Sequence, residues 1–328
     1  MFWVKNLCLI LTGILILESH ACAQKPAAPP VSVILDTDMD SDVDDVGALA
    51  MLHAYEKRNM ARILGIIVTS DEKYSAGCTD AINRWFGRKD IPIGVSQKDS
   101  LRTFSRYTRQ ISERFPTRFT TNADAEDGTA LYRKLLAAQP DTSVVIITIG
   151  HLTSLARLMT SGPDTISPLN GADLVKRKVK RWSCMGGQFP AGKEANFYRP
   201  DPASTIICLA KWELPVTFAG WEAGNQIVTG GPAFKSQSNP NSPTYHAYDL
   251  YNGFAGRASW DQLSVLEAIE GTDPYFDLRK DGQCKVAPDG SNQWISLPNG
   301  LHGYLSIRSS VATIRERINM LMLGTRNP

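Results

Sequence analysis

The fold is decided by the stretch Val31-Ser32-Val33-Ile34-Leu35-Asp36-Thr37-Asp38-Met39-Asp40-Ser41-Asp42-Val43-Asp44-Asp45. Its first five residues form a short apolar run, which is typical of a buried parallel strand, and Asp36 ends that run. A helix is predicted over Val46–Tyr55, directly after the last carboxylate. The stretch therefore encodes a strand, an acidic turn and a helix in succession.

The alternation of strand and helix continues along the chain. Further strands are predicted at Ile63–Thr69, Ile91–Val95, Ser143–Ile149, Val179–Met185 and Val216–Phe218, and further helices at Ser75–Trp85, Thr129–Ala138, Ala203–Lys211, Leu263–Ile269 and Val311–Met322. This order indicates βαβ units. We expect a single α/β domain over residues 31–328, with a mostly parallel, Rossmann-like sheet flanked by helices. Within it, Gly230–Pro243 is expected to be a mobile loop, and Gly271–Gly303 a loop-rich section with strand-like pieces.

The N-terminal residues have the pattern of a signal peptide. Lys5 precedes the apolar run Leu7–Leu17, and Ala21-Cys22-Ala23 supplies small residues at a cleavage site. The run is shorter than the ~20 residues of a membrane-spanning helix. We expect a signal peptide over residues 1–23, a Pro-rich linker over 24–30, and an exported protein, periplasmic or secreted, without a membrane segment after cleavage. A lipid anchor at Cys22 is the competing interpretation, although Ser19-His20-Ala21 lacks the aliphatic residue of a lipobox.

The charge and the cysteine content limit which ligands and metal sites are expected. The chain has 35 basic and 33 acidic residues, a net charge of +2, so no long-range field selects a nucleic acid. We expect a small-molecule ligand, no nucleic acid, and a possible homo-oligomer. The cysteines that remain after cleavage are too widely spaced for a zinc site. Cys184 and Cys208 stand in apolar contexts and are expected to be small buried residues, although an oxidising compartment also permits disulfides.

The acidic turn is the most informative chemical feature. Six carboxylates fall within Asp36–Asp45 and repel one another unless a cation neutralises them. Ligands gather beyond the carboxyl ends of strands in open α/β sheets, and hard oxygen ligands suit Ca²⁺ or Mg²⁺. An EF-hand does not fit, because Ser41 and Gly47 stand where its loop needs Gly and Glu. A haloacid-dehalogenase-type phosphatase, which also begins with a strand and Asp-x-Asp, stays open, although Asp40 departs from its pattern.

Four segments together resemble one family. Asp36-Thr37-Asp38 followed by Asp44-Asp45 and a helix resembles the amino-terminal fingerprint of nucleoside hydrolases of the inosine-uridine preferring type. The other three follow in family order: Ile149–Ser154; Met185-Gly186-Gly187 with Glu194–Phe197 and Asp201-Pro202; and Ser259-Trp260-Asp261 with Leu263–Leu266. The resemblance implies the nucleoside hydrolase fold and an N-glycosidase that releases base and ribose from ribonucleosides or related ribosyl compounds.

The resemblance also implies a calcium site and a ribose site. The ion would bind the ribose 2′- and 3′-hydroxyls and a water, and Asp38 would accept the proton of that water as the catalytic base. The implied metal ligands are Asp38, Asp45, the main-chain carbonyl of Ile149, and Asp261. The implied ribose-binding residues are Asp44, Gln188, Glu194 and Asn196. Because the turn is longer than in the shortest family members, Asp40 and Asp42 could exchange roles with Asp38 and Asp44.

The main departure from the family is Trp260, which replaces a histidine that protonates the leaving base. An indole cannot do this, so Trp260 is expected either to contact substrate by stacking or to pack in the core. Alternative acids are sought on a helix that carries Tyr245, His246, Tyr248 and Tyr251. Two further alternatives stay open: a calcium-containing ribosyl- or sugar-binding protein without turnover, and a metal-dependent phosphatase.

Overall fold

The computed structural model describes residues 29–96 and 104–324, so the predicted signal peptide lies outside the described residues. Its main sheet has the strand order β4-β3-β2-β1-β5-β6-β8-β13-β11-β12-β7. The strands of this sheet are β1 (Val31–Thr37), β2 (Ala61–Val68), β3 (Ile93–Val95), β4 (Glu126–Asp127), β5 (Val144–Thr148), β6 (Val179–Met185), β7 (Ala191–Gly192), β8 (Val216–Ala219), β11 (Phe276–Val286), β12 (Asn292–Ser296) and β13 (His302–Ile307). Neighbours from β4 to β13 are parallel, whereas β11, β12 and β7 extend the sheet in antiparallel pairs. The predicted mostly parallel α/β sheet is confirmed.

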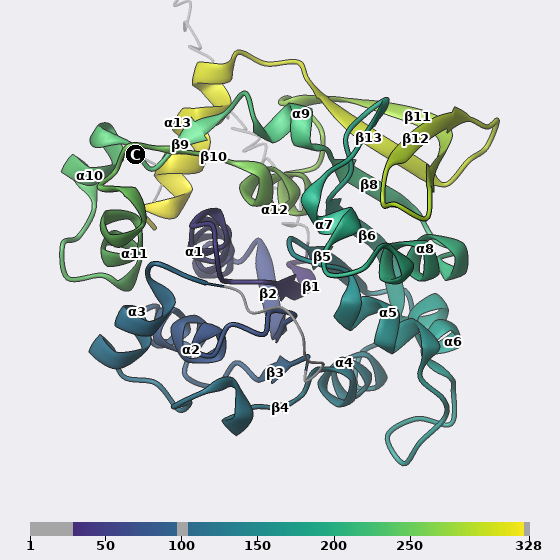
Figure 1. Ribbon diagram of the computed structural model, residues 1–328, viewed down its shortest axis with the longest axis horizontal. Helices are drawn as coiled ribbons and strands as arrows, with labels where there is room; N and C mark the ends of the chain where they lie inside the picture. The colour runs from purple at the N-terminus through teal and green to yellow at the C-terminus, as the bar shows by residue number, and fades with distance from the viewer. Residues whose placement is uncertain (1–28, 97–103, 325–328) are drawn as a thin grey trace, which may run out of the picture.

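Helices cover both faces of the sheet (Figure 1). One face packs against α1 (Asp44–Lys57), α2 (Ser75–Trp85), α11 (Pro243–Asn252), α12 (Trp260–Glu270) and α13 (Val311–Met322). The other packs against α4 (Gly128–Ala137), α5 (Thr153–Thr160), α6 (Gly171–Lys178) and α8 (Pro202–Lys211). The shorter elements are α3 (Thr108–Arg114), a 3-10 turn at Asn122–Asp124, α7 (Ala195–Tyr198), α9 (Trp221–Gly224), α10 (Pro232–Gln237), and the antiparallel pair β9 (Val228–Thr229) and β10 (Arg257–Ala258).

Strand β1 distributes its side chains to the two faces in turn. Val33 and Leu35 belong to the core on the α1 side, and Ile34 to the core on the α4 side. Asp36 follows the same alternation and is buried toward α4, where the Tyr132 hydroxyl donates to its Oδ2 at 2.7 Å. Asp36 is therefore separated from the other carboxylates of the acidic turn by the pleat of the strand.

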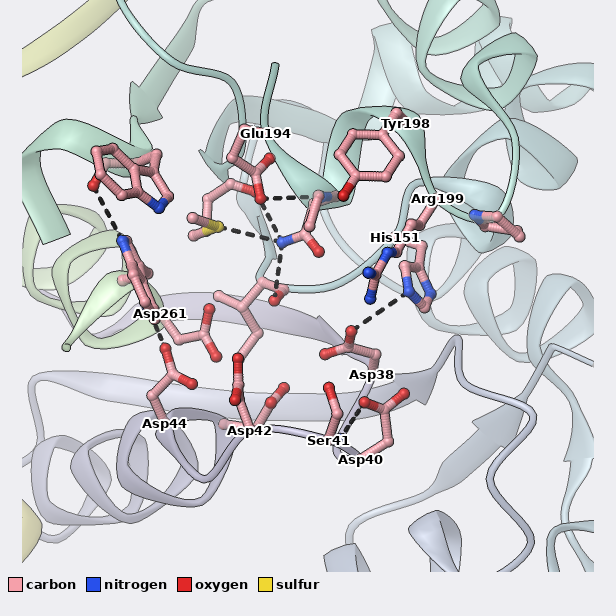
Figure 2. A pocket seen from close by; sticks show the side chains of 18 of the residues that line it. Asp38, Asp40, Ser41, Asp42, Asp44, His151, Glu194, Tyr198, Arg199 and Asp261 are labelled. Carbon is pink, nitrogen blue, oxygen red and sulfur yellow. Dashed lines mark hydrogen bonds and ion pairs between the residues drawn. The ribbon is translucent and has the colours of Figure 1, made fainter. Parts of the chain in front are cut away.

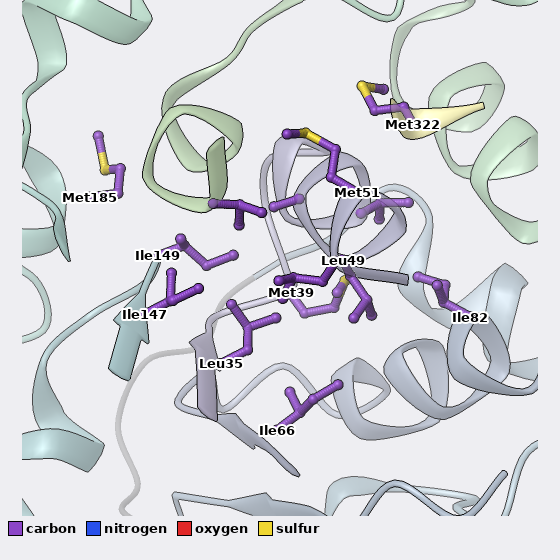
Figure 3. Packing of buried hydrophobic residues seen from close by; sticks show 14 of the residues in the cluster. Leu35, Met39, Leu49, Met51, Ile66, Ile82, Ile147, Ile149, Met185 and Met322 are labelled. Atoms are coloured by element: carbon purple, nitrogen blue, oxygen red, sulfur yellow. The ribbon is translucent and has the colours of Figure 1, made fainter. Parts of the chain in front are cut away.

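The core on the α1 side reaches the carboxyl ends of the central strands. Figure 3 shows Leu35 and Ile147 within the sheet, with Ile149 just after β5 and Met185 at the end of β6, all in one buried cluster. The apolar packing thus supports the region in which β1, β5 and β6 end.

Two expectations about loops need correction. Gly230–Pro243 is not a continuous loop, because it contains α10 behind Pro232, a residue suited to the first turn of a helix. Gly271–Gly303 holds β11, β12 and the start of β13, which are more regular than strand-like pieces. Helices α3, α5 and α6 were not predicted. Cys78, Cys184, Cys208 and Cys284 are free and buried, which confirms the expectation for Cys184 and Cys208. Within the described ranges, no helix has the length and hydropathy needed to cross a bilayer.

His53 on α1 makes stability depend on pH. It is buried, its Nε2 lies 2.8 Å from Asn83 Oδ1, and burial lowers its pKa from 6.5 to about 4. The unfolded chain gains this proton near pH 6.5 and the folded chain only near 4, so stability is lost as the pH falls through that window. Relative to His53→Gln, the wild-type free energy of unfolding should drop by about 3 kcal/mol between pH 7 and 4 in urea titrations. Parallel pH profiles for the two proteins would contradict this.

Candidate active site

A cavity of about 820 Å³ opens at the carboxyl ends of the central strands. Asp38 follows β1, Ile149 follows β5, Met185 ends β6 and Trp221 stands just beyond β8, and all four line the cavity. Parallel strands bring these ends to one edge of the sheet, where α/β proteins bind ligands. Figure 2 shows the carboxylates of the acidic turn on one wall, facing Glu194 and Tyr198 on the other.

Three buried carboxylates form the centre of the acidic wall. One oxygen from each of Asp44, Asp45 and Asp261 lies within 4.8 Å of the other two. Asp44 and Asp45 begin α1, and Asp261 lies in the first turn of α12, so two helix N-termini face the cluster. Asp45 is held by the Thr37 hydroxyl and by the main-chain N–H of Met39, both donating to Oδ1.

The electrostatics of this wall favour a cation. Burial, followed by the neighbouring carboxylates, raises the pKa of Asp38, Asp44 and Asp261 well above the ordinary range. Burial also raises the pKa of Asp45 to about 7, although the Thr37 hydroxyl opposes this. A hard divalent cation would remove the repulsion and stabilise the ionised forms. The residues present therefore fit such an ion.

The predicted metal ligands all line the cavity. Asp45 and Asp261 belong to the triad, and Asp44, predicted to bind ribose, is its third member. Asp38 lies beside the triad in contact with Asp45, and the Ile149 carbonyl accepts from Asn196 Nδ2 at 3.4 Å. The structure brings these groups together, and their division between metal and ribose stays a prediction.

Asp40 and Asp42 also line the cavity, but Asp42 has protein partners. Tyr251 donates to Asp42 Oδ1 at 2.8 Å, and Arg257 Nη2 lies 2.7 Å from Oδ2. These contacts neutralise Asp42 at the rim, whereas Asp44 lies in the triad. The geometry thus favours Asp44 over Asp42 as the carboxylate that binds a ligand in the cavity.

Glu194 and Asn196 stand on the opposite wall, at the start of α7. Glu194 accepts from the main-chain N–H groups of Asn196 at 2.9 Å and Gly187 at 3.0 Å, which orients its carboxylate. Burial raises the pKa of Glu194 to about 7. Asn196 Nδ2 also contacts Met185 Sδ at 3.1 Å. Both predicted ribose-binding residues are therefore fixed in the cavity.

Gln188 does not line the cavity. Its main-chain N–H donates to Asn292 Oδ1, and its carbonyl accepts from Asn292 Nδ2, both at 2.9 Å. A Cβ on Gly192 would meet the Gln188 side chain, which places that side chain beside β7. The main chain of Gln188 thus connects the Glu194 wall to Asn292 of β12. The position of Gln188 does not support the predicted substrate contact.

Trp260 lines the cavity, and its indole N–H is hydrogen-bonded within the protein. Its Nε1–H donates to the Trp221 carbonyl at 2.9 Å, and the Arg257 guanidinium lies 4.7 Å from its ring centre. The indole thus offers the cavity a flat apolar surface. Tyr245, His246, Tyr248 and Tyr251, the alternative acids, do not line the cavity.

Several lining residues were not predicted to be in the site. Among them are His151, Lys193, Tyr198, Arg199, Trp221 and Arg257. His151 Nε2 lies 3.5 Å from Asp38 Oδ2, and burial lowers its pKa. The sequence did hold a signal for two of these residues. Trp221 follows a predicted strand, and Arg199 comes just after the Glu-Ala-Asn-Phe segment.

Comparisons with known proteins agree with this geometry. The model of the family inosine-uridine preferring nucleoside hydrolase matches residues 33–292. A search of curated proteins finds no match. Among solved structures, an inosine-uridine preferring nucleoside hydrolase from Bacillus anthracis has 16% identity and a TM-score of 0.67, over 90% of this chain and 100% of that chain.

Two further solved structures have the same fold. A plant nucleoside hydrolase has 18% identity and a TM-score of 0.65, over 90% of this chain and 98% of that one. The type III effector protein XopQ, complexed with adenosine diphosphate ribose, has 15% identity and a TM-score of 0.66, over 90% and 93%. At such identities the likeness establishes the fold, and the family match covers most of the chain. The chain therefore belongs to the inosine-uridine preferring nucleoside hydrolase family and is an N-glycosidase.

Proposed function

We propose that this cavity hydrolyses the N-glycosidic bond of ribonucleosides or related ribosyl compounds with the help of Ca²⁺. The observation that carries the proposal is the buried triad of Asp44, Asp45 and Asp261, which faces Glu194 and Asn196 across one cavity. Carboxylates suit Ca²⁺ because it accepts several oxygen ligands in flexible geometry. The relative that holds adenosine diphosphate ribose also supports a ribosyl ligand.

Different residues of the chain would hold the ion, accept the proton and stabilise the sugar. When bound, Ca²⁺ supplies a Lewis acid that lowers the pKa of water and fixes ribose hydroxyls. The chain would hold the ion with Asp45, Asp261, Asp38 or Asp44, and the Ile149 carbonyl. Asp38 accepts the proton of the attacking water at a carboxylate oxygen while the bond from the anomeric carbon to the base breaks. The electron pair leaves with the base, and the surrounding carboxylates stabilise the positive charge that develops on the sugar.

A nucleoside panel tests this proposal. The protein is incubated with purine and pyrimidine ribonucleosides in the presence of Ca²⁺, Mg²⁺ or a chelator, and free base and ribose are measured by chromatography. We expect release with Ca²⁺ and its loss with the chelator. Nucleoside binding without release across the panel would indicate a ribosyl-binding protein. Release of phosphate from phosphate esters with a preference for Mg²⁺ would indicate a phosphatase.

Trp260→His is expected to raise turnover on nucleosides whose bases leave poorly. The wild-type indole N–H is bound to the Trp221 carbonyl, so it cannot protonate the leaving base. An imidazole can act as a general acid near neutral pH. The measurement compares kcat on inosine with kcat on a p-nitrophenyl riboside, whose leaving group needs no proton. Equal changes on both substrates would contradict a missing acid.

We also propose that the protein acts outside the cytoplasm, as its N-terminal sequence indicates. Cleavage after Ala23 predicts a mature chain that begins at Gln24. Mass spectrometry of the protein recovered from the periplasm or medium of an expressing bacterium checks this. A lipid-modified Cys22 at the mature N-terminus would support the anchored form instead.

A further inference from the structure

We propose, on the basis of the proposed function, that the substrate carries a phosphate on the ribose C5′, so that a nucleoside 5′-phosphate is preferred to the free nucleoside. The cavity has two chemically different ends. One is lined by aromatic rings and a neutralised arginine, and the other by two cations that converge on one tyrosine. The carboxylate triad, which would receive the ribose diol, adjoins the aromatic end, because Asp261 follows Trp260 in α12.

The cationic end is formed by Lys193 and Arg199, on either side of α7. Lys193 Nζ lies 5.3 Å and Arg199 Cζ 5.7 Å from the centre of the Tyr198 ring, and all three residues line the cavity. Within the described ranges, no carboxylate lies at ion-pair distance from Arg199. Lys193 has one such contact, at 3.5 Å to the exposed Asp289. Both cations line the cavity beside one tyrosine. Guanidinium and ammonium groups bind phosphate through charge-assisted hydrogen bonds, so this end of the cavity suits a phosphate.

The opposite end has no such unbalanced charge. Trp260 is next to Asp261 of the triad in the sequence, and its indole N–H donates a hydrogen bond to the Trp221 carbonyl. The cation at this end, Arg257, is matched by Asp42 at 2.7 Å. Flat rings suit stacking with a nucleobase, and a neutralised arginine has little charge left for phosphate.

The geometry of ribose connects the two ends. C1′, which carries the base, and C4′, which carries C5′, lie on opposite sides of the 2′,3′-diol. With the diol at the triad and the base toward Trp260, the C5′ substituent must point away from Trp260. Figure 2 shows Asp44 and Asp261 at one side of the pocket and His151 and Arg199 at the other, with Tyr198 beside Arg199. A 5′-phosphate therefore extends toward Arg199 and Lys193.

The test compares matched substrates on the calcium-loaded mature protein. Uridine and uridine 5′-phosphate, and inosine and inosine 5′-phosphate, are assayed with chromatographic detection of base and of ribose or ribose 5-phosphate. We expect kcat/KM to be at least about tenfold higher for each 5′-phosphate, as one moderately strong charged contact provides. Arg199→Met and Lys193→Met should each reduce that ratio toward one, mainly through a higher KM for the phosphate.

Matched control variants separate this effect from loss of surface charge. Lys235 is the counterpart of Lys193: it is equally exposed, lies 4.9 Å over the Phe254 ring and 3.9 Å from Asp249, and is outside the cavity. Arg114, over the Phe115 ring at 6.0 Å, is the counterpart of Arg199. Lys235→Met and Arg114→Met should leave the preference for the phosphate unchanged.

Several outcomes would overturn the 5′-phosphate assignment. One is equal or faster cleavage of the nucleosides, and another is a preference that survives both Arg199→Met and Lys193→Met. Orotidine, whose base carries a carboxylate, is a further arm: selective loss of orotidine cleavage in Arg199→Met would place the anion on the leaving base instead.

A binding measurement keeps the inference testable without turnover. Ribose and ribose 5-phosphate are titrated into the calcium-loaded protein by calorimetry, and a lower Kd for the phosphate that rises in Arg199→Met is expected. If no base is released from any substrate, the proposed N-glycosidase reaction fails. Equal Kd values for the two sugars overturn the phosphate site alone.

Discussion

Asp261→Asn is expected to abolish nucleoside hydrolysis while making the metal-free protein more resistant to heat. The substitution removes one carboxylate from a triad whose oxygens lie within 4.8 Å of one another. Loss of outer-shell support alone typically costs a metal site 10- to 100-fold, so loss of a ligand should lower kcat/KM by more than about a hundredfold. Calcium titration followed by chromatographic detection of base release measures this.

The gain in heat resistance follows from the same repulsion. Burial and then the neighbouring carboxylates Asp44, Asp45 and Asp38 raise the pKa of Asp261. Without a cation, ionising the triad near neutral pH is costly, and a neutral amide at one position removes part of that cost. Differential scanning calorimetry in chelator should therefore give a higher Tm for Asp261→Asn than for wild type, and added Ca²⁺ should raise the Tm of wild type alone.

Asp36→Asn is the matched control for Asp261→Asn. Asp36 is another buried carboxyl of the same segment, and burial raises its pKa to about 8, but it lies on the α4 face with Tyr132. This variant should keep the calcium-dependent rise in Tm and the activity. If Asp261→Asn behaved like Asp36→Asn in both measurements, the triad would not be the metal site.

Gly150→Ala should reduce kcat/KM by about a hundredfold, the scale of loss when a catalytic group is displaced by about 1 Å. A Cβ on Gly150 would lie 2.5 Å from the main-chain nitrogen of Asp38 and 2.9 Å from its Cβ. These contacts are too short, and a main-chain atom cannot rotate away, so the turn that carries Asp38 must shift. Steady-state kinetics with Ca²⁺ measures the loss.

Gly162→Ala provides the control for this change. No atom lies within 4 Å of the position that its Cβ would take, so activity should match wild type. The variants differ in their effect on Asp38, which is the expected catalytic base. Unchanged activity in a folded Gly150→Ala protein would mean that the position of Asp38 does not limit the reaction.

The sequence predicted the central sheet and the acidic wall for a common reason. Continuous apolar runs such as Val31–Leu35 identify buried parallel strands, and the residues that follow such strands must meet at one edge. Asp38 and Ile149 could therefore be placed together before their positions were known. The predicted helix start at Val46 was also close, because α1 begins at Asp44.

Elements that face solvent on one side were harder to predict. Strand β11 has charged residues in its middle and an irregular register between Arg279 and Gly282, so its period-two pattern is interrupted. Helices α5 and α6 have eight residues each, too few for a decisive helical period. Lys193 and Arg199 were missed because exposed basic residues are common, and only the folded structure shows that both line the cavity.

Because β7 pairs with β12, the acidic wall and the Glu194 wall of the cavity are held in place by different parts of the sheet. The acidic wall grows from the ends of the innermost strands, whereas the Glu194 wall is anchored at the sheet margin by Asn292, about a hundred residues further along the chain. Insertions or deletions in the β11–β12 hairpin would thus tilt the Glu194 wall and leave the acidic wall in place. In this architecture, the shape of the cavity can change on one side while the carboxylate triad stays as it is.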